Sequence, residues 1–279
     1  MNQAWIRTSR ERPCVVCGRF DWCMSSSNGA VAICPRTENG SKRYIDGSGY
    51  LHIIDKSLPM PERRDEVGQE LPEHNTVLST IAGKMMEACP DESIDQLASS
   101  LGVERFALKL LRVGWSSTAN AYSFPMFRVG QRLIGVRLRS IAGKKWAIKG
   151  SKQGLFMPFN WPSIKRGVLV CEGPTDTAAM LGLGFNVVGR ASACGSQAMV
   201  AEAVQGRPVC IISDSDSVGI ESSSRLSEHL LRTTSCNKVA ILIPPAKDAR
   251  DWVRSGISRE TALLEVSRSF QRSGPYQSQ

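Results

Sequence analysis

Two short acidic motifs in the C-terminal half of the chain follow hydrophobic segments of the kind that form buried strands. Glu172 comes directly after the apolar run at 168–171, and Asp214 and Asp216 follow the apolar run at 208–212. Such runs alternate here with helical patterns, which predicts parallel strands whose carboxyl ends meet at one edge of a sheet. Aspartates two positions apart after one strand can both face one divalent ion. The pattern therefore indicates a site for Mg²⁺ or Mn²⁺ that would hold phosphate oxygens.

A third acidic segment borders the same predicted edge. Asp248 follows the apolar run at 239–243, which we expect to be the last strand of the sheet. A simpler interpretation of Asp214 and Asp216 is that they cap a helix, as aspartates in loops commonly do. That interpretation weakens because carboxylates recur at equivalent strand ends, with Glu172 on one strand and Asp248 on another.

Four of the nine cysteines are clustered near the N-terminus, and the other five are scattered. In a reducing compartment such clustering indicates a metal rather than disulfides. Cys14 and Cys17 form a Cys-x-x-Cys turn, which presents two sulfurs to one tetrahedral ion, and Cys23 and Cys34 complete a four-thiolate set. Four protein ligands leave no position open for water, so the predicted zinc is structural. His52 is the alternative fourth ligand, although its strand-like surroundings are more typical of a packed histidine.

The positive charge of the chain is concentrated in one stretch. The 279 residues carry a net charge of +9, and residues 119–165 contain nine Lys or Arg and no Asp or Glu. A stretch without carboxylates favours a surface that binds a polyanion. Alternation at 133–139 predicts a strand with Arg137 and Arg139 on one face.

Patterning along the chain predicts six segments. A region of β-hairpins around the metal is followed by a Pro- and charge-rich linker and a small helical segment. The helical segment could form a helix-turn-helix, but its acidic charge favours a packing or spacer role. A basic β-rich segment, a βαβα region and a tail complete the chain. The predicted boundaries are 1–57, 58–74, 75–118, 119–165, 166–267 and 268–279.

Several classes of protein are disfavoured. No run approaches the roughly 18 apolar residues that span a bilayer. The polar, basic start lacks the apolar core of a secretory signal, so we expect a cytoplasmic protein that does not contact membranes. The three histidines are dispersed, which disfavours a Ser-His-Asp hydrolase. The sequence contains no GxxxxGK[ST] motif, which disfavours a built-in helicase motor.

The acidic motifs also match a known family. The segment EGPTD at 172–176, followed by DSDSVG at 214–219, resembles the Toprim domain, which bacterial-type primases, topoisomerases, certain nucleases and a recombination mediator share. KDARDW at 247–252 is similar to the element that follows in primases. Three stretches look like the basic subdomain that precedes Toprim in primases: 123–126, 134–139 and 154–156. With the zinc ribbon, the order resembles a bacterial or phage-type DNA primase, and specifically the compact primases of mobile genetic elements.

This resemblance implies an α/β fold with a Toprim-type parallel sheet core, preceded by a basic β-rich primase subdomain and an N-terminal zinc ribbon. It implies that Glu172 acts on metal and protons and that Asp214 and Asp216 bind catalytic Mg²⁺ or Mn²⁺. Asp248 would help to bind a second metal or the incoming triphosphate. Asp176 can equally be an acid that favours the positive end of a helix. The implied contacts to template or nucleotide phosphates are Arg137, Arg139, Lys144, Lys145 and Lys149.

We therefore predict a DNA primase that synthesises short RNA primers on single-stranded DNA by metal-dependent nucleotidyl transfer. The expected partners are single-stranded DNA, nucleoside triphosphates and a separately encoded replicative helicase. Two alternatives use the same features: a Toprim metal-dependent nuclease, and a non-enzymatic zinc/Toprim recombination mediator that binds DNA. The zinc ribbon and the basic segment favour priming. A topoisomerase is disfavoured because its tyrosine requires a large gate domain.

Overall fold

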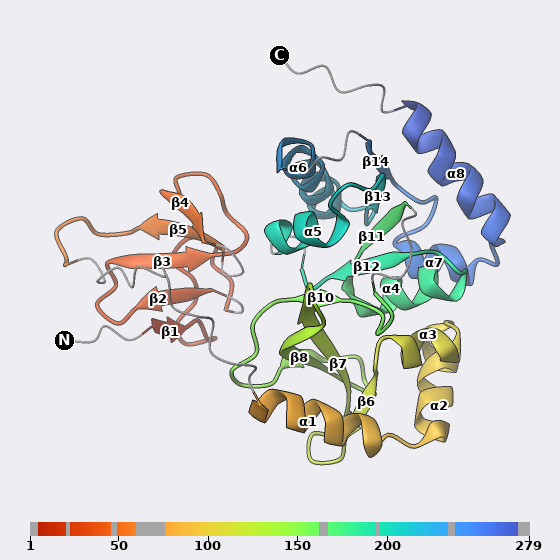
Figure 1. The fold of residues 1–279 in the computed structure, drawn as a ribbon. Coiled ribbons are helices and arrows are strands. Elements are labelled where there is room, and N and C mark those ends of the chain that lie inside the picture. The colour runs from red at the N-terminus through yellow and green to blue at the C-terminus, as the bar shows by residue number, and fades with distance from the viewer. Residues whose placement is uncertain are drawn as a thin grey trace. The chain divides into compact units, whose positions relative to one another are not determined.

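The chain folds into two compact units, which are described separately (Figure 1). The first unit runs from Met1 to Pro72 and the second from Glu73 to Gln279. The computed structural model describes residues 5–20, 23–45, 49–59, 76–161, 167–192, 196–233 and 238–272. Most of the predicted linker and the end of the predicted tail therefore lie outside the described residues.

The first unit is an antiparallel sheet of short strands. Its described strands pair in the order β1-β2-β3-β5-β4. The turn between β2 and β3 places Gly29 at φ +78°, a left-handed conformation that glycine adopts without steric cost. Val31, Ile33 and Leu51 contribute to a small core. The strands are β1 (Trp5–Arg7), β2 (Met24–Ser26), β3 (Val31–Cys34), β4 (Arg43–Ile45) and β5 (Gly49–Ile53).

A single mixed sheet organises the second unit. Among the described residues its strands follow the order β14-β13-β11-β12-β10-β7-β8-β9, and β6 pairs with β7. β14, β13, β11 and β12 are parallel, whereas the remaining neighbours are antiparallel. The strands are β6 (Gly114–Ser116), β7 (Ala121–Arg128), β8 (Arg132–Ser140), β9 (Lys145–Ala147), β10 (Leu155–Phe156), β11 (Val168–Glu172), β12 (Val187–Arg190), β13 (Val209–Ile212) and β14 (Val239–Leu242). The predicted α/β class with a parallel core is confirmed.

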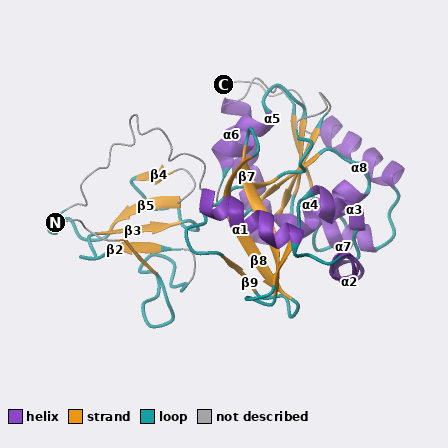
Figure 2. Ribbon diagram, turned by 60° about the horizontal axis from the view of Figure 1, so that its bottom comes forward, coloured by secondary structure: helices purple, strands orange, loops and turns teal. Residues whose placement is uncertain are grey.

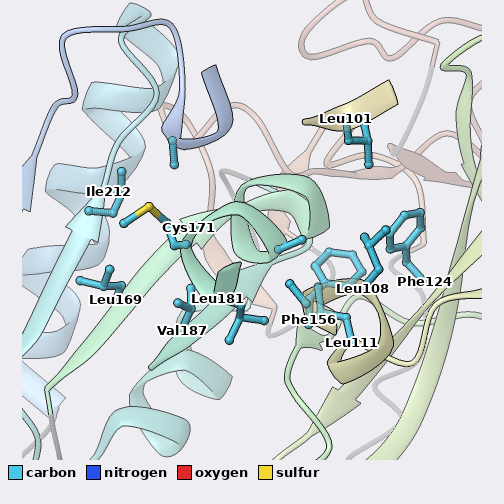
Figure 3. Close-up of a cluster of buried hydrophobic side chains, with 14 of the residues drawn as sticks. Leu101, Leu108, Leu111, Phe124, Phe156, Leu169, Cys171, Leu181, Val187 and Ile212 are labelled. Atoms are coloured by element: carbon cyan, nitrogen blue, oxygen red, sulfur yellow. The ribbon is translucent and has the colours of Figure 1, made fainter. Parts of the chain in front are cut away.

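Helices cover both faces of the parallel strands, which explains why these strands are apolar throughout. α5 and α6 lie on one face, and α4, α7 and α8 lie on the other (Figure 1, Figure 2). In β11, Val168 and Val170 belong to the core under α5 and α6, whereas Leu169 and Cys171 belong to the opposite core, which Figure 3 shows. The helices are α4 (Gly173–Gly182), α5 (Gln197–Val204), α6 (Ser217–Thr233), α7 (Ala249–Arg254) and α8 (Arg259–Arg272).

Three further helices are α1 (Thr76–Glu87), α2 (Asp91–Leu101) and α3 (Arg105–Leu110). α1 packs against β6, β7 and β8, whereas α2 contacts α3, which in turn contacts α4. The apolar stripe of α2, which includes Ile94 and Leu101, joins the core that also contains Phe124 of β7. The hydroxyl of Tyr122 donates to the carbonyl of Ser93 over 3.0 Å, which ties β7 to α2. Packing against the sheet thus accounts for the predicted helical segment.

The short strand β10 joins the basic and parallel parts of the sheet. Leu155 pairs with Arg190 of β12 and with Phe127 of β7. The sheet therefore continues from the predicted basic segment, 119–165, into the predicted catalytic segment, 166–267. Within the described parts of the chain, no helix is both long and apolar enough to cross a bilayer.

Gly189 in β12 has no room for a side chain. A Cβ atom there would collide with the hydroxyl of Thr177, and would lie 3.0 Å from the carbonyl oxygen of Gly173 and 3.1 Å from Cβ of Phe156. We expect Gly189→Ala to lower the free energy of unfolding by about 2–3 kcal/mol, because the contacts on α4 are partly backbone and cannot all move away. The measurement is urea unfolding followed by helical circular dichroism, since all described helices lie in the second unit.

Gly83→Ala is the matched control. Gly83 lies inside α1, and a Cβ atom there would meet nothing within 4 Å. This substitution is expected to stabilise the second unit by roughly 0.5–1 kcal/mol through the helix propensity of alanine. Equal effects of the two substitutions would contradict the packing argument.

Candidate functional site

The predicted carboxylates converge at one edge of the parallel sheet. Glu172 is the last residue of β11, Asp214 follows β13, and Asp248 follows β14. These strands are neighbours in the order β14-β13-β11 and run parallel, so their carboxyl ends meet. Asp216 lies in the same loop after β13, so all four predicted metal-binding residues are found at this edge.

Backbone contacts hold the acidic loop after β13 in place. The amide of Ser213 donates to the carbonyl of Leu242 over 2.9 Å, and the amide of Ser215 donates to that of Lys247 over 3.0 Å. Gly219 permits the close approach of the loop to α6, since a Cβ atom there would lie 2.8 Å from Cβ and from the carbonyl oxygen of Asp214. The loop is therefore anchored to β14 and to the start of α6.

Two of the aspartates also cap helices. The Oδ1 atom of Asp216 accepts from the amide of Gly219 over 2.7 Å, at the start of α6. Oδ1 of Asp248 accepts from the amide of Asp251 over 2.8 Å, at the start of α7. The capping interpretation weighed from the sequence thus applies to Asp216, and capping orients both side chains at the edge of the sheet.

Glu172 is followed by a sharp turn into α4. Gly173 has φ +78°, a conformation in which any other residue except Asn or Asp would be strained. The hydroxyl of Thr177 donates to the carbonyl of Gly173 over 2.6 Å. The Glu-Gly-Pro motif therefore ends β11 with its carboxylate at the sheet edge and begins the helix immediately.

Asp176, for which the sequence left a role at the positive end of a helix equally open, lies beside these carboxylates. It is buried on α4, and its Oδ1 accepts from the amide of Arg250 over 3.0 Å. Burial, and then the charge of Asp248, raise the pKa of Asp176 to about 6. The available signal was its position, one helical turn after Glu172 within the same motif.

These carboxylates influence one another electrostatically. Burial raises the pKa of Asp214 to about 7, and the charges of Glu172, Asp176, Asp248 and Asp216 add to the effect. Among the described residues, however, no three carboxylates form a closed set of ligand atoms. Mg²⁺ commonly takes one or two carboxylates, with water and substrate phosphates completing its shell. The donor chemistry of this edge therefore fits an open Mg²⁺ or Mn²⁺ site.

Three cationic side chains lie beside the carboxylates. Burial, and then the neighbouring Arg250, lower the pKa of Arg139. Lys145 is exposed to solvent on β9, yet nearby protein atoms and then the charge of Arg139 lower its pKa, while Asp176 opposes that change. Arg139 and Lys145 thus lie near Arg250, whose guanidinium is 4.0 Å from the Asp248 carboxylate.

The other predicted basic residues are placed differently. Arg137 is buried, and its Nη1 donates to the carbonyl of Ala191 over 2.6 Å. Lys144 and Lys149 are exposed around β9, with the ammonium of Lys144 lying 5.9 Å from the ring of Trp146. Alternation in β8 could not distinguish a covered position from an open one, because the covering carbonyl comes from a loop 54 residues later.

The four predicted zinc ligands form a compact cluster in the first unit. The Sγ atoms of Cys14, Cys17, Cys23 and Cys34 all lie within 4.8 Å of one another. Those of Cys17 and Cys23 are 3.6 Å apart, and those of Cys23 and Cys34 are 3.9 Å apart. Zn–S bonds of about 2.3 Å in a tetrahedron separate the sulfurs by roughly 3.8 Å. The arrangement and the soft thiolate donors fit a structural zinc.

His52, the alternative fourth ligand, contacts the backbone, and a guanidinium lies beside the cysteines. The Nε2 atom of His52 lies 2.8 Å from the carbonyl oxygen of Thr37, to which it donates, so this ring faces the backbone. The guanidinium of Arg36 lies 3.5 Å from the Cys23 sulfur and 3.9 Å from that of Cys17. It offsets part of the negative charge that four thiolates bring to a divalent ion.

Comparison with known proteins identifies the fold. No family model matches the chain, and no curated protein matches its sequence. Among solved structures, the chain is similar to the DnaG catalytic core, with a TM-score of 0.58 and 14% identity over 70% of this chain and 79% of that one. The chain has the fold of a primase catalytic core.

Two further structures share this primase fold. The DnaG primase catalytic domain bound to single-stranded DNA matches with a TM-score of 0.58 and 13% identity, over 70% of this chain and 78% of that one. The Aquifex aeolicus primase, comprising zinc-binding and RNA polymerase domains, matches with a TM-score of 0.53 and 16% identity, over 69% and 60% of the respective chains.

The zinc ligands can be tested by metal analysis. We expect Cys23→Ser to reduce the zinc content of the purified protein from about one ion per chain to near zero, because three thiolates cannot close the tetrahedron. His52→Ala should retain the zinc. If His52→Ala lost its zinc while Cys23→Ser kept it, His52 would be the fourth ligand instead.

The raised pKa of Asp214 makes stability depend on pH. Its folded-state pKa of about 7 lies above the roughly 3.9 of an unfolded aspartate, so the folded state holds the proton more tightly. The contribution of Asp214 to stability is thus fully present below about pH 4 and is lost as the pH rises through 7. Without added divalent ions, we expect Asp214→Asn to reduce the loss between pH 5 and pH 8 by about 1–2 kcal/mol, after allowance for solvent screening.

The measurement is urea unfolding at both pH values, with Glu221→Gln as a control. Glu221 is an exposed carboxylate on α6 that pairs with Arg225, so its substitution should leave the pH dependence unchanged. A steeper loss in the Asp214 variant would show that its carboxylate stabilises the metal-free fold.

Proposed function

We propose that this protein is a DNA primase that synthesises short RNA primers on single-stranded DNA. The observation that carries the proposal is the convergence of carboxylates from three neighbouring parallel strands, beside basic side chains, in a chain with the primase fold. Metal-dependent nucleotidyl transfer requires both kinds of group, since carboxylates hold the ions and cations hold the triphosphate.

Mg²⁺ or Mn²⁺, held by Glu172, Asp214 and Asp216 with Asp248, would stabilise the charge that develops as phosphoryl transfer proceeds. In the reaction, the 3′ hydroxyl of the primer attacks the α-phosphate of a nucleoside triphosphate and pyrophosphate leaves. The side chains around the site would position the nucleotide and screen its charge. We assign the capture of the triphosphate to Arg139, Lys145 and Arg250.

The template would approach from the basic part of the sheet. Lys144 and Lys149 are exposed around β9 and would contact backbone phosphates, a mode that needs no particular base sequence. The zinc-binding unit would select the start site. A separately encoded helicase would supply single-stranded template, and the parallel with the catalytic domain bound to single-stranded DNA supports this choice of substrate.

The first test is primer synthesis on single-stranded DNA, with labelled ribonucleotides and Mg²⁺ or Mn²⁺. Asp214→Asn and Asp216→Asn are each expected to lower product formation roughly 100-fold or more, since each removes charge that the metal needs. Glu221→Gln should retain full activity because its carboxylate lies on the exposed side of α6. Helical circular dichroism confirms that each variant is folded.

The outcomes also separate the alternatives. Normal synthesis by both aspartate variants would refute the assigned site. Metal-dependent cleavage of DNA or RNA without added nucleotides, and no primer synthesis, would instead favour a nuclease. Strong DNA binding that survives loss of Glu172, Asp214 and Asp216, without turnover, would favour a recombination mediator.

A further inference from the structure

A buried arginine lies next to the predicted catalytic glutamate, on the neighbouring strand. Arg190 of β12 pairs with Glu172 of β11 in the parallel register, so both side chains are on the same face of the sheet. Arg190 is 1% exposed, and it is among the largest fully buried side chains in the described structure. A guanidinium at such depth requires partners that satisfy its charge and its donors.

The guanidinium connects two elements that carry the acidic site. Its Nη1 donates to the hydroxyl of Ser222 on α6 over 3.0 Å, and its Nη2 lies 4.0 Å from Oε2 of Glu172. Ser222 is itself completely buried. α6 begins directly after Asp216, whose carboxylate caps it. One side chain therefore links the strand end that bears Glu172 to the helix that follows the aspartate loop.

A second buried cation reinforces this arrangement. Arg137 donates to the carbonyl of Ala191, the residue after Arg190, and the charge of Glu172 opposes the lowering of the Arg137 pKa by burial. Glu172 is thus close to two buried guanidinium groups, from β12 and from β8. Its own side chain remains 28% exposed, which leaves it accessible to a metal.

We propose that Arg190 is a positioning residue that holds the Glu172 carboxylate and α6 in a fixed relation, so that the acidic groups of β11 and β13 are arranged before substrate binds. The inference rests on the proposed function, in which Glu172 is a metal ligand. A planar guanidinium can contact Ser222 and Glu172 at once from separate nitrogens, whereas an ammonium presents a single point charge. Arginine therefore serves here in a way that lysine cannot.

The test is Mn²⁺ binding to the zinc-loaded protein by calorimetry, for Arg190→Lys alone and combined with Glu172→Gln. Residues that orient metal ligands typically contribute 10–100-fold in metal affinity. We expect Arg190→Lys to weaken binding about 10-fold in the wild-type background and to have no further effect when Glu172 is already Gln. Arg225→Lys, on α6 but paired with the exposed Glu221, is the control and should bind Mn²⁺ normally.

A second variant protects the test against misfolding. Ser222→Ala removes only one hydroxyl, and we expect it to weaken Mn²⁺ binding in the same direction by about 3-fold, with normal helical circular dichroism. In primer synthesis, Arg190→Lys should raise the metal concentration needed for half-maximal rate and leave KM for nucleotides unchanged.

Two results would overturn the positioning role. One is unchanged Mn²⁺ affinity in both Arg190→Lys and Ser222→Ala. The other is an equal loss of Mn²⁺ affinity on Arg190→Lys whether residue 172 is Glu or Gln. The metal titration does not depend on catalysis. If Mn²⁺ binding follows the expected cycle but no primer forms, the proposed function fails while the role of Arg190 stands. If primers form normally and the cycle shows no coupling, the role of Arg190 fails while the proposed function stands.

Discussion

The carboxylates at the end of the parallel strands repel one another, and the rest of the second unit must hold them together against that repulsion. Burial raises the pKa of Asp214 to about 7, and the charges of four neighbouring carboxylates add to the effect. Contacts that do not depend on these charges help to hold the site: backbone hydrogen bonds from Ser213 and Ser215, and an apolar core on each face of the sheet. The Arg190 guanidinium adds a charged contact to Glu172. A rigid scaffold with unfavourable charge is suited to bind cations, because the cation relieves the repulsion.

The two candidate metal centres of the chain differ in how their donor atoms are arranged. In the first unit, four sulfurs lie within 4.8 Å of one another, and no ligand position remains for water. Carboxylates in the second unit are gathered without closing around a point, which leaves positions for phosphate oxygens. Each centre has a guanidinium beside it, Arg36 next to the cysteines and Arg190 next to Glu172. The chemistry of each donor set thus fits the role proposed for it, structural for the cysteines and catalytic for the carboxylates.

The basic and acidic parts of the second unit lie close together because one sheet contains both. β10 contributes only Leu155 and Phe156, yet it pairs with β12 on one side and with β7 on the other. This connection brings Arg139 of β8 and Lys145 of β9 near Asp176 and Arg250. The helices α2 and α3 support the same arrangement from one face, through the core around Phe124.

The sequence by itself determined the features that depend on local pattern. Apolar runs followed by Glu172, Asp214 and Asp248 located the strand ends, and the Cys-x-x-Cys spacing located the metal cluster. What only the tertiary structure decided was burial and long-range contact: Arg137 is covered by a loop beyond β12, Asp176 joins the acidic group, and Arg190 lies beside Glu172 on the neighbouring strand. Alternation along a strand specifies which face a side chain takes, but the element that covers that face comes from a distant part of the chain.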